Sequence, residues 1–256
     1  MRLTFLGTGT SSGVPMIGCT CAVCTSSDPR DRRLRSAVLL EVHGRTLLVD
    51  AGPDLRQQLL REQVRTLDAV LLTHEHMDHI AGIDELRSFN FLLKRPMDIH
   101  GSARTLEAVR HVFHYAFAKP GERYPGVPEL ELHAIPDAPF HVLGLEIIPV
   151  HVTHHMMPVL GFRVGGLAYL TDVKSIAPEE KAKLLGLDVL VLSALRQKPH
   201  ISHLTLSEAL SLVEELRPKR AFFTHISHQM GRHDEVNTTL PPHVAMAYDG
   251  LKVELA

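Results

Sequence analysis

Several features that would place this chain of 256 residues in a familiar class are scarce or absent. It has no tryptophan and 5% aromatic residues, and 27 Lys and Arg nearly balance 29 Asp and Glu, for a formal net charge of −2. A dedicated nucleic-acid binder would need a basic excess, so this balance argues against nucleic acid as the partner. No apolar run approaches the roughly 20 residues of a membrane span, and residues 1–7 lack a signal-peptide core, which predicts a cytoplasmic protein without a membrane partner.

Cysteine is also scarce, since the only three lie between Cys19 and Cys24. An odd, clustered set excludes a disulfide scaffold and indicates a reducing compartment or a metal site. Histidine, in contrast, is abundant, with 18 copies. The 45% of apolar residues can form a large core, and no linker, repeat or low-complexity stretch divides the chain. We therefore expect a single domain over residues 1–256.

Apolar periodicity predicts two batches of strands, each followed by helices, so that two packed sheets with helices outside account for the order. Strands are expected at 3–6, 37–42, 46–49, 69–72, near 99, and at 130–135, 145–152, 161–164, 168–170, 189–192, 221–223 and 244–247. Helices are expected from the Gly52-Pro53 pair, over 80–91, 103–117 and 178–185, and after a capping box at Thr205 and Glu208.

One segment concentrates metal-ligand residue types: His74-x-His76-x-Asp78-His79, at the end of an apolar strand. In an extended backbone residues i and i+2 point the same way, so His74 and His76 can bind one ion. Asp78 and His79 lie where the chain turns into a helix and can face a second ion. Imidazole suits Zn, Fe and Mn, and a carboxylate accommodates the harder ions among them. Chance clustering of loop histidines is the alternative, which four ligand-type residues in six positions disfavour.

This segment resembles the HxHxDH signature of the metallo-β-lactamase superfamily, and the resemblance extends over nearly the whole chain. It implies an α/β (α+β) chain folded as a four-layer αββα sandwich, and a hydrolase with two divalent ions, Zn or Mn, with Fe as a third choice. Asp50, after an apolar strand, resembles the family's carboxylate that supports the metal-binding loop from behind. The implied ligands are His74, His76 and His154 for one ion, Asp78, His79 and His225 for the other, and Asp172 shared.

The sequence alone does not decide which residue supplies one of these ligands. The family's histidine precedes a Pro-x-x-Gly strand, and His151, His154 and His155 all precede Pro158-Val159-Leu160-Gly161. We favour His154 because its distance from that strand matches the branch of the family described next. Two ions about 3.5–4 Å apart would polarise a phosphoryl or acyl oxygen and supply a bridging hydroxide at neutral pH.

A second metal site is suggested by Cys19-x-Cys21-x-x-Cys24. Three thiolates leave a tetrahedral zinc one ligand short, and His228, three residues after His225, could complete it. The pairing of CxCxxC with THISH resembles the phosphonate-catabolism branch of the superfamily, the phosphoribosyl 1,2-cyclic phosphate phosphodiesterases, and implies a structural zinc. Small buried thiols or a redox cluster are the alternative, which a loop of Gly, Thr and Ala disfavours because it offers little core.

The substrate class depends on His203, which precedes a predicted helix N-terminus where the dipole and free amides favour an anion. Its position resembles the histidine of the phosphodiesterase branch that binds phosphate or protonates the leaving oxygen; a surface histidine near a helix cap is the alternative. The glycine-rich segment 7–13 lacks the Gly-Lys-Ser/Thr ending of a Walker motif and is interpreted as a turn that shapes the floor of the site.

Together these residues predict a dinuclear-metal phosphodiesterase that acts on a small or cyclic phosphate diester, with Asp78, His203 and Asp50 as its catalytic candidates. A tRNA 3′-processing endoribonuclease is the main rival, but its protruding arm has no counterpart longer than the Pro/Gly-rich loop 119–129. A thioester or lactone hydrolase would require neither His203 nor the cysteines. A non-catalytic binding module is disfavoured because every candidate ligand is present. A homodimer is compatible with the family.

Overall fold

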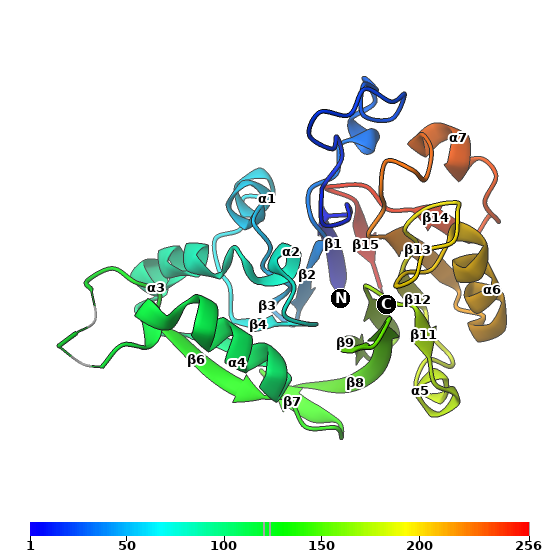
Figure 1. The fold of residues 1–256 in the computed structure, drawn as a ribbon. Helices are drawn as coiled ribbons and strands as arrows, with labels where there is room; N and C mark the ends of the chain where they lie inside the picture. The colour runs from blue at the N-terminus through cyan, green and yellow to red at the C-terminus, as the bar shows by residue number, and fades with distance from the viewer. Residues whose placement is uncertain (120, 123, 256) are drawn as a thin grey trace.

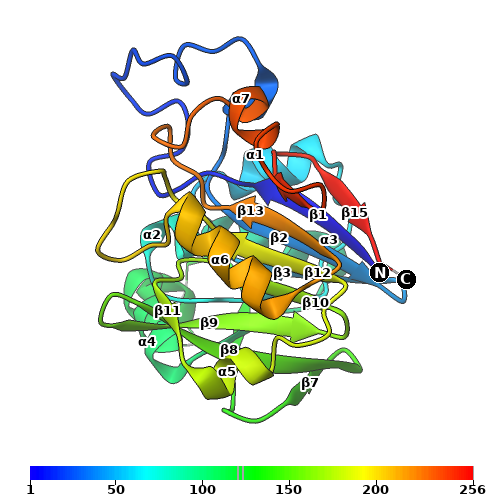
Figure 2. The ribbon, with the colours of Figure 1, turned by 90° about the vertical axis from the view of Figure 1, so that its right-hand side faces the viewer.

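The chain folds into two β-sheets that pack face to face, with helices outside each sheet (Figures 1 and 2). The computed structural model describes residues 1–119, 121–122 and 124–255. Within this part of the chain the first sheet has seven strands in the order β15-β1-β2-β3-β4-β5-β6. Their bounds are Arg2–Gly7 for β1, Ala37–Val42 for β2, Arg45–Val49 for β3, Ala69–Leu71 for β4, Met97–Gly101 for β5, Leu130–Ala134 for β6 and Lys252–Glu254 for β15.

The second sheet runs in the order β11-β8-β9-β10-β12-β13-β14, and β7 pairs with β8 beside it. Neighbours from β3 to β6 are parallel in the first sheet, as are β10, β12, β13 and β14 in the second. The bounds are Phe140–Val142 for β7, Leu145–His154 for β8, Met157–Val164 for β9, Leu167–Leu170 for β10, Ser175–Ile176 for β11, Val189–Ser193 for β12, Arg220–Thr224 for β13 and Val244–Met246 for β14.

Helices form the two outer layers. Figure 1 shows α1 to α4 on the side of the first sheet and α5 to α7 on the side of the second. The α-helices are α1 (Leu55–Arg61), α2 (Met77–Ile80), α3 (Arg87–Leu93), α4 (Ala103–Val112), α5 (Pro178–Ala182), α6 (Leu206–Leu216) and α7 (His233–Asn237). Short 3-10 helices cover Pro29–Asp31, Ile83–Leu86 and His114–Phe117.

The apolar side chains of the central strands alternate between two buried layers. In β12, Val189 and Val191 pack between the sheets, whereas Leu190 and Leu192 pack under the helices of the second sheet. In β3 the same alternation sends Leu48 towards the helices of the first sheet. Strands covered on both faces are expected to be continuously apolar, and each buried Val or Leu contributes about 1.5–3 kcal/mol. The predicted four-layer αββα sandwich is confirmed.

Two predicted helices differ in the structure. The helix expected to open at Gly52-Pro53 begins at Leu55, with Asp54 as its N-cap residue; the Asp54 side chain accepts the backbone N–H of Arg35 at 2.8 Å and makes no cap hydrogen bond to the helix. The helix expected over 80–91 is divided into α2, a 3-10 turn and α3. Gly82 lies at the first break, where a Cβ atom would stand 2.0 Å from the carbonyl oxygen of Gly52. That close packing of two loops bends the chain away from a continuous helix.

Three smaller differences concern chain ends and turns. The predicted helix 103–117 ends at Val112, so His111 and His114 do not share one α-helix. Strands β8 and β9 extend to a two-residue turn, whose first residue, His155, has a φ of +58°. The short strands β7 and β11 had no prediction.

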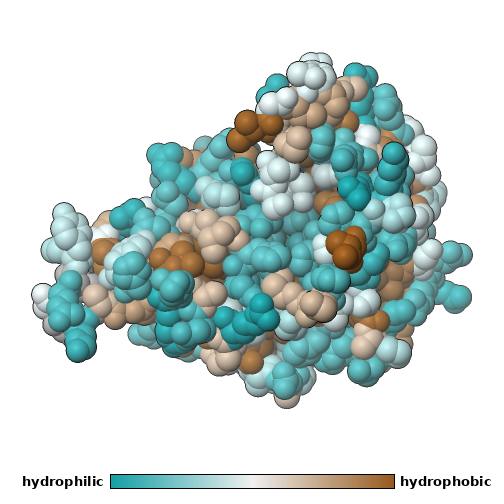
Figure 3. All heavy atoms as spheres, in the orientation of Figure 1, coloured by the Kyte–Doolittle hydropathy of each residue, from teal (hydrophilic) through white to brown (hydrophobic). Residues whose placement is uncertain are grey.

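The surface offers no large apolar feature in the view of Figure 3, where the apolar residues lie in small separate groups on a mostly hydrophilic face. Among the helices of the described residues, none has the length and apolar character that crossing a bilayer requires.

Candidate metal centre

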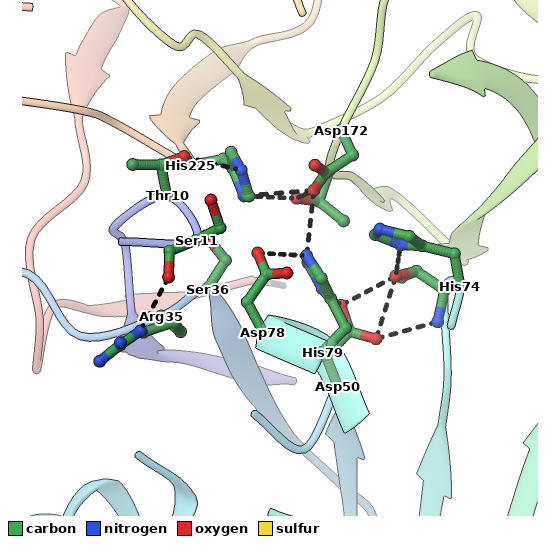
Figure 4. A network of polar contacts seen from close by, with 12 residues as sticks. Thr10, Ser11, Arg35, Ser36, Asp50, His74, Asp78, His79, Asp172 and His225 are labelled. Carbon is green, nitrogen blue, oxygen red and sulfur yellow. Dashed lines mark hydrogen bonds and ion pairs between the residues drawn. The ribbon is translucent and has the colours of Figure 1, made fainter. Parts of the chain in front are cut away.

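The residues of the candidate centre lie where strands of both sheets end. Asp50 follows β3 directly, His225 follows β13 directly, and Asp172 comes two residues after β10. His154 is the last residue of β8. Because the carboxyl ends of parallel neighbours meet at one edge of a sheet, these ends bring residues far apart in sequence to one place (Figure 4).

Three of these residues adopt a left-handed backbone that non-glycine residues seldom use. The φ angles are +66° for Asp50, +53° for Asp172 and +56° for His225. Such a conformation costs on the order of 1 kcal/mol or more, and it persists where the surroundings fix it. Here it turns the chain sharply at each strand end and directs the side chain into the centre, as Figure 4 shows.

The HxHxDH segment lies in the loop after β4 and in the short helix α2. His74 and His76 follow the end of β4 rather than lying within it, and their rings meet edge to face at 4.7 Å between centroids. Asp78 and His79 belong to α2. The loop after β3 passes closely beneath this helix, because a Cβ atom at Gly52 would stand 2.1 Å from the carbonyl oxygen of Asp78. Only glycine permits this approach.

A buried hydrogen-bond network fixes the orientation of two imidazoles. Asp50 accepts the backbone N–H of Thr73 at 2.9 Å, its hydroxyl at 2.9 Å and the Nδ1 atom of His79 at 2.7 Å. Since the Thr73 hydroxyl donates its hydrogen to Asp50, its oxygen accepts from Nδ1 of His74, which lies 2.9 Å away. In both rings Nδ1 carries the proton and Nε2 keeps its lone pair. Thr73 is a part of the site that sequence reasoning missed, although it directly precedes the motif.

The Nε2 atoms of His74 and His79 show whether these residues could act as metal ligands. The Nε2 atoms of His74 and His79 are buried and have no hydrogen-bond partner among the described residues. A buried polar atom without a partner is costly, and a lone pair on neutral imidazole is a metal ligand. Ligand atoms of His74, His79 and Asp172 lie within 4.8 Å of one another, as do those of Asp78, His79 and His225. The donor set therefore fits divalent ions.

Two carboxylates face the same point as these imidazoles. The Nε2 atom of His79 lies 3.2 Å from Oδ2 of Asp78 and 3.2 Å from Oδ2 of Asp172, and Nδ1 of His225 lies 3.2 Å from Oδ2 of Asp172. Burial opposes ionisation, but His225 and His79 hold the pKa of Asp172 well below its ordinary value. Burial likewise opposes ionisation of Asp78, yet His79 and His225 keep its pKa low. Buried carboxylates of this kind need cationic partners.

The hairpin of β8 and β9 distinguishes among the three candidate histidines before residue 158. His154 lies with His76, at 5.3 Å between ring centroids, and its Nδ1 atom is 2.9 Å from the carbonyl oxygen of Ser202. That contact occupies Nδ1 and leaves Nε2 of His154 available to bind a metal. No sequence pattern had indicated a role for Ser202. His155 is exposed in the turn, and Nε2 of His151 lies 3.5 Å from Asp137. The structure thus brings His154 to the centre and leaves the other two outside it.

His203 also faces the centre. Its ring lies 4.4 Å from that of His154 and 5.1 Å from that of His225, and its Nδ1 atom is 3.7 Å from Oδ1 of Asp172. The residue is 8% exposed. Burial and the neighbouring His225 lower the pKa of His203 to about 3, so the ring is neutral at neutral pH and one of its nitrogens can donate a hydrogen bond.

The glycine-rich segment near the N-terminus closes one side of the centre. The hydroxyl of Thr10 lies 3.2 Å from Nε2 of His225, and the backbone of Thr10 bonds to that of Ile226 at 3.1 Å. Figure 4 shows Thr10 and Ser11 beside the carboxylate and imidazole group. A Cβ atom at Gly9 would stand 2.7 Å from the carbonyl oxygen of Arg33, so the close turn needs glycine there.

A second cluster joins the cysteine loop to the C-terminal half. The Sγ atoms of Cys19 and Cys21 each lie 3.3 Å from Nδ1 of His228, and ligand atoms of these three residues and Cys24 lie within 4.8 Å of one another. The backbone of Cys24 and the ring of His228 lower the pKa of the Cys21 thiol to about 6, and burial raises that of Cys24 to about 11. Val14 and Val23 are the buried apolar neighbours of this loop among the described residues, so it has little core of its own.

A third group of possible ligands lies apart, on β5 and β6. His133 and Asp98 form a pair at 2.6 Å, with Glu131 beside them. All three side chains are at least partly exposed, and they share no residue with the other two clusters.

Comparison with known proteins places this geometry in a family. A beta-lactamase superfamily domain model matches residues 45–226. A relative named octanoyltransferase, from Porphyromonas gingivalis, is 40% identical over 255 residues, which cover 98% of this chain. The same alignment covers 51% of the relative, so this chain spans about half the length of that protein.

Solved structures share the fold over the whole chain. The crystal structure of a diphosphatase from the PhnP family has a TM-score of 0.93 and 41% identity, and the match covers 100% of this chain and 98% of that one. The short form of human tRNase Z has a TM-score of 0.75 and 21% identity, with full coverage of both chains, and shows likeness of fold alone. The family match, the 41% identical structure and the two-sheet fold together show that the chain belongs to the metallo-β-lactamase superfamily of hydrolases.

Proposed function

We propose that the chain is a dinuclear-metal phosphodiesterase that hydrolyses a small or cyclic phosphate diester. The observation that carries the proposal is the pair of buried, unpartnered imidazole nitrogens of His74 and His79, facing the carboxylates of Asp78 and Asp172. The resemblance in sequence and fold to a diphosphatase of the PhnP family supports phosphorus as the centre under attack.

The proposed ligands fall into two sets that share one carboxylate. When bound, two divalent ions such as Zn or Mn would supply Lewis acidity and a hydroxide nucleophile at neutral pH. Asp50 holds the ring of His79, and through Thr73 the ring of His74, so that Nε2 of each stays directed at the centre. The sets are His74, His76 and His154 on one side, Asp78, His79 and His225 on the other, with Asp172 between them.

His203 is the proposed contact to the reacting phosphate. Its ring stands against His154 and His225 and close to Asp172, at the boundary of the two ligand sets. From there a neutral N–H can donate to a phosphoryl oxygen or to the leaving oxygen as negative charge grows on it. A hydrolase of carboxylic thioesters would not need this extra donor.

We further propose a structural zinc held by Cys19, Cys21, Cys24 and His228, whose donor atoms are already close together. Three thiolates and one imidazole suit a closed tetrahedral zinc site. Because His228 follows His225 by three residues, the same short loop would serve both metal sites.

Thioester hydrolysis is the second candidate, and one observation favours it. The 40% identical relative is named an octanoyltransferase, which is acyl chemistry. This chain covers only half of that protein, so the name can describe the other half. RNA cleavage ranks lower, since the net charge is −2 and the likeness to human tRNase Z is one of fold.

A substrate panel with purified, metal-loaded protein tests the proposal. It comprises bis(p-nitrophenyl) phosphate, a cyclic nucleotide, ribose 1,2-cyclic phosphate, a nucleoside diphosphate and an octanoyl thioester. We expect hydrolysis of the diesters. Turnover of the thioester alone would contradict the proposal that the substrate is a phosphate diester. Metal analysis should find about three ions per chain, two in the centre and one at the cysteines.

Substitution at Asp78 tests the dinuclear arrangement. Asp78→Ala removes a proposed ligand and should reduce diester hydrolysis by about a thousandfold or more, with the circular dichroism spectrum retained. The matched control is Asp98→Ala, which removes an aspartate paired with a histidine outside the centre. Unchanged turnover in Asp78→Ala would contradict the mechanism.

A further inference from the structure

The glycine-rich segment 7–13 contacts a candidate metal ligand but has no role in the function proposed above. The hydroxyl oxygen of Thr10 lies 3.2 Å from Nε2 of His225. Two backbone hydrogen bonds fix this contact, because the N–H of Thr10 donates to the carbonyl of Ile226 at 3.1 Å and the N–H of Ile226 donates to the carbonyl of Thr8 at 2.9 Å. Thr10 is 7% exposed and His225 is 1% exposed, so water does not compete for the contact.

The ring of His225 is oriented differently from the other imidazoles of the centre. Three candidate ligands use Nδ1 for a contact with a protein oxygen and keep Nε2 available, namely His74, His79 and His154. In His225 the two nitrogens are exchanged, since Nε2 contacts Thr10 and Nδ1 lies 3.2 Å from Oδ2 of Asp172. Figure 4 shows the ring between Thr10 and Asp172. The nitrogen of His225 that faces the centre is therefore Nδ1.

The surroundings of this Nδ1 atom suit a metal ion better than a hydrogen bond. Oδ2 of Asp172 lies 3.2 Å from Nδ1 of His225 and 3.2 Å from Nε2 of His79. Nε2 of His79 carries no proton, because Nδ1 of that ring donates to Asp50. The same Oδ2 atom already accepts the hydroxyl of Thr171 at 2.6 Å. Lone pairs that face a buried carboxylate oxygen repel it, and a divalent ion bound by all three atoms would remove this repulsion.

We propose that Thr10 is a positioning residue of the metal centre, which accepts the Nε2–H of His225 and so makes Nδ1 of that ring the metal ligand. A neutral imidazole carries one proton, so the nitrogen that is held as a donor decides which nitrogen keeps its lone pair. The inference rests on the dinuclear centre of the proposed function. It gives the glycine-rich segment a part in holding one ion, through the orientation of a ligand.

Long-range ¹H–¹⁵N spectra of protein labelled with ¹⁵N-histidine test the position of the proton. In the zinc-loaded protein we expect His225 to carry its proton on Nε2 and to bind zinc through Nδ1. The rings of His74 and His79 should show the opposite pattern, with the proton on Nδ1. The His225→Gln variant assigns the signals of His225, which it lacks. A His225 ring that binds zinc through Nε2, or that does not change when zinc is added, would overturn the proposal.

Variants at position 10 then test whether the hydroxyl is responsible. Thr10→Val keeps the size of the side chain without an acceptor, and we expect the affinity for one divalent ion to fall by about tenfold or more. The Nε2–H signal of His225 should also be lost to exchange with water. Thr10→Ser keeps the acceptor and should match the parent in both measurements. Equal metal affinity in Thr10→Val and Thr10→Ser would overturn the role of the hydroxyl.

The matched control is Ser12→Ala, in the same segment. Ser12 is exposed, and its hydroxyl donates to the carbonyl of Gly13 at 3.3 Å. This variant should keep the metal affinity and the His225 signals of the parent, and a loss as large as that in Thr10→Val would assign the effect to the loop as a whole and overturn the proposal. The spectra of the parent protein test the position of the proton even where Thr10→Val does not fold.

These measurements use no substrate, so they separate the inference from the proposed function. If no diester is hydrolysed but His225 binds zinc through Nδ1 and depends on Thr10, the phosphodiesterase assignment fails and the role of Thr10 stands. If diesters are hydrolysed and the ring binds zinc through Nε2, the proposed function stands and this inference fails.

Discussion

The Nδ1 atom of His79 lies 2.7 Å from Oδ2 of Asp50, and both side chains are fully buried. Burial raises the pKa of Asp50, and the hydrogen bonds from His79 and Thr73 oppose that rise. The pair fixes which nitrogen of the ring carries the proton and directs Nε2 at the centre. Asp50 thus acts on a metal through the orientation of a ligand.

Asp50→Asn should weaken metal binding while leaving the fold intact. The amide keeps the size of the side chain but has no charge, and it presents an N–H at one of the two positions where the carboxylate accepted. We expect the affinity for one divalent ion to fall by about 10- to 100-fold. Metal content after dialysis against a graded series of metal buffers measures this.

Asp98→Asn is the control for that experiment, because Asp98 also pairs with a histidine, His133, but on the outer strands β5 and β6. It should retain the metal content of the parent protein. Equal metal affinity in Asp50→Asn and the parent would show that the pair has no part in holding the ion.

Much of this arrangement follows from sequence because local patterns fix it. Strands such as β12 are apolar over a continuous run of four residues, which predicts burial on both faces, and the HxHxDH motif places four ligand-type residues within six positions. Asp50 and His225 could be identified through the resemblance to the metallo-β-lactamase superfamily, and each follows a short apolar strand.

The remainder depends on contacts between distant segments, which no local pattern encodes. The choice of His154 over His155 follows from the register of the β8–β9 hairpin, in which His154 pairs with Met157. Shifting the turn by one residue would reverse the choice. The break in the predicted helix 80–91 depends on the approach of Gly82 to Gly52, thirty residues earlier in the chain.

Cys21→Ser should remove one zinc per chain and reduce both stability and activity. The Sγ atom of Cys21 lies 3.3 Å from Nδ1 of His228, so its loss opens the proposed zinc site, and we expect Tm to fall by about 5 °C or more. Activity should fall by about tenfold, because the loop from His225 to His228 would lose its anchor. Elemental analysis, calorimetric melting and diester hydrolysis provide the three readouts.

Thr20→Ser, an exposed substitution in the same loop, controls for disturbance of the loop itself. It should match the parent in zinc content, Tm and rate. A Cys21→Ser protein that kept full zinc content, stability and activity would count against the structural zinc.

His203→Ala should reduce diester hydrolysis by about 10²- to 10⁴-fold while the metal content stays unchanged. The size of the loss should depend on the leaving group if His203 supplies a proton to the leaving oxygen. p-Nitrophenolate leaves without protonation, whereas an alkoxide does not, so an alkyl diester should lose more than an aryl diester. An equal loss on both would assign His203 to phosphate binding, and no loss on either would remove it from catalysis.

The stability of the protein should depend on pH through His233, which is 3% exposed. Its Nδ1 atom lies 3.1 Å from Nη2 of Arg33, and burial together with this arginine lowers the pKa of His233 to about 4. In the unfolded chain a histidine titrates near 6.5. Between pH 6.5 and about 4 the unfolded state therefore holds a proton that the folded state does not, so the free energy of unfolding falls as the pH is lowered through this window.

His233→Gln should remove this dependence, because the amide oxygen can accept from Arg33 but does not titrate. Urea unfolding at a series of pH values should show the parent losing on the order of 2 kcal/mol more than the variant between pH 7 and 4.5. Protonation of the metal ligands affects both proteins alike, so the difference between the two curves isolates His233. His111→Gln, on the exposed face of α4, should follow the parent curve. Parallel curves for the parent and His233→Gln would mean that His233 is protonated equally in the folded and unfolded states, and that its burial against Arg33 does not shift its pKa.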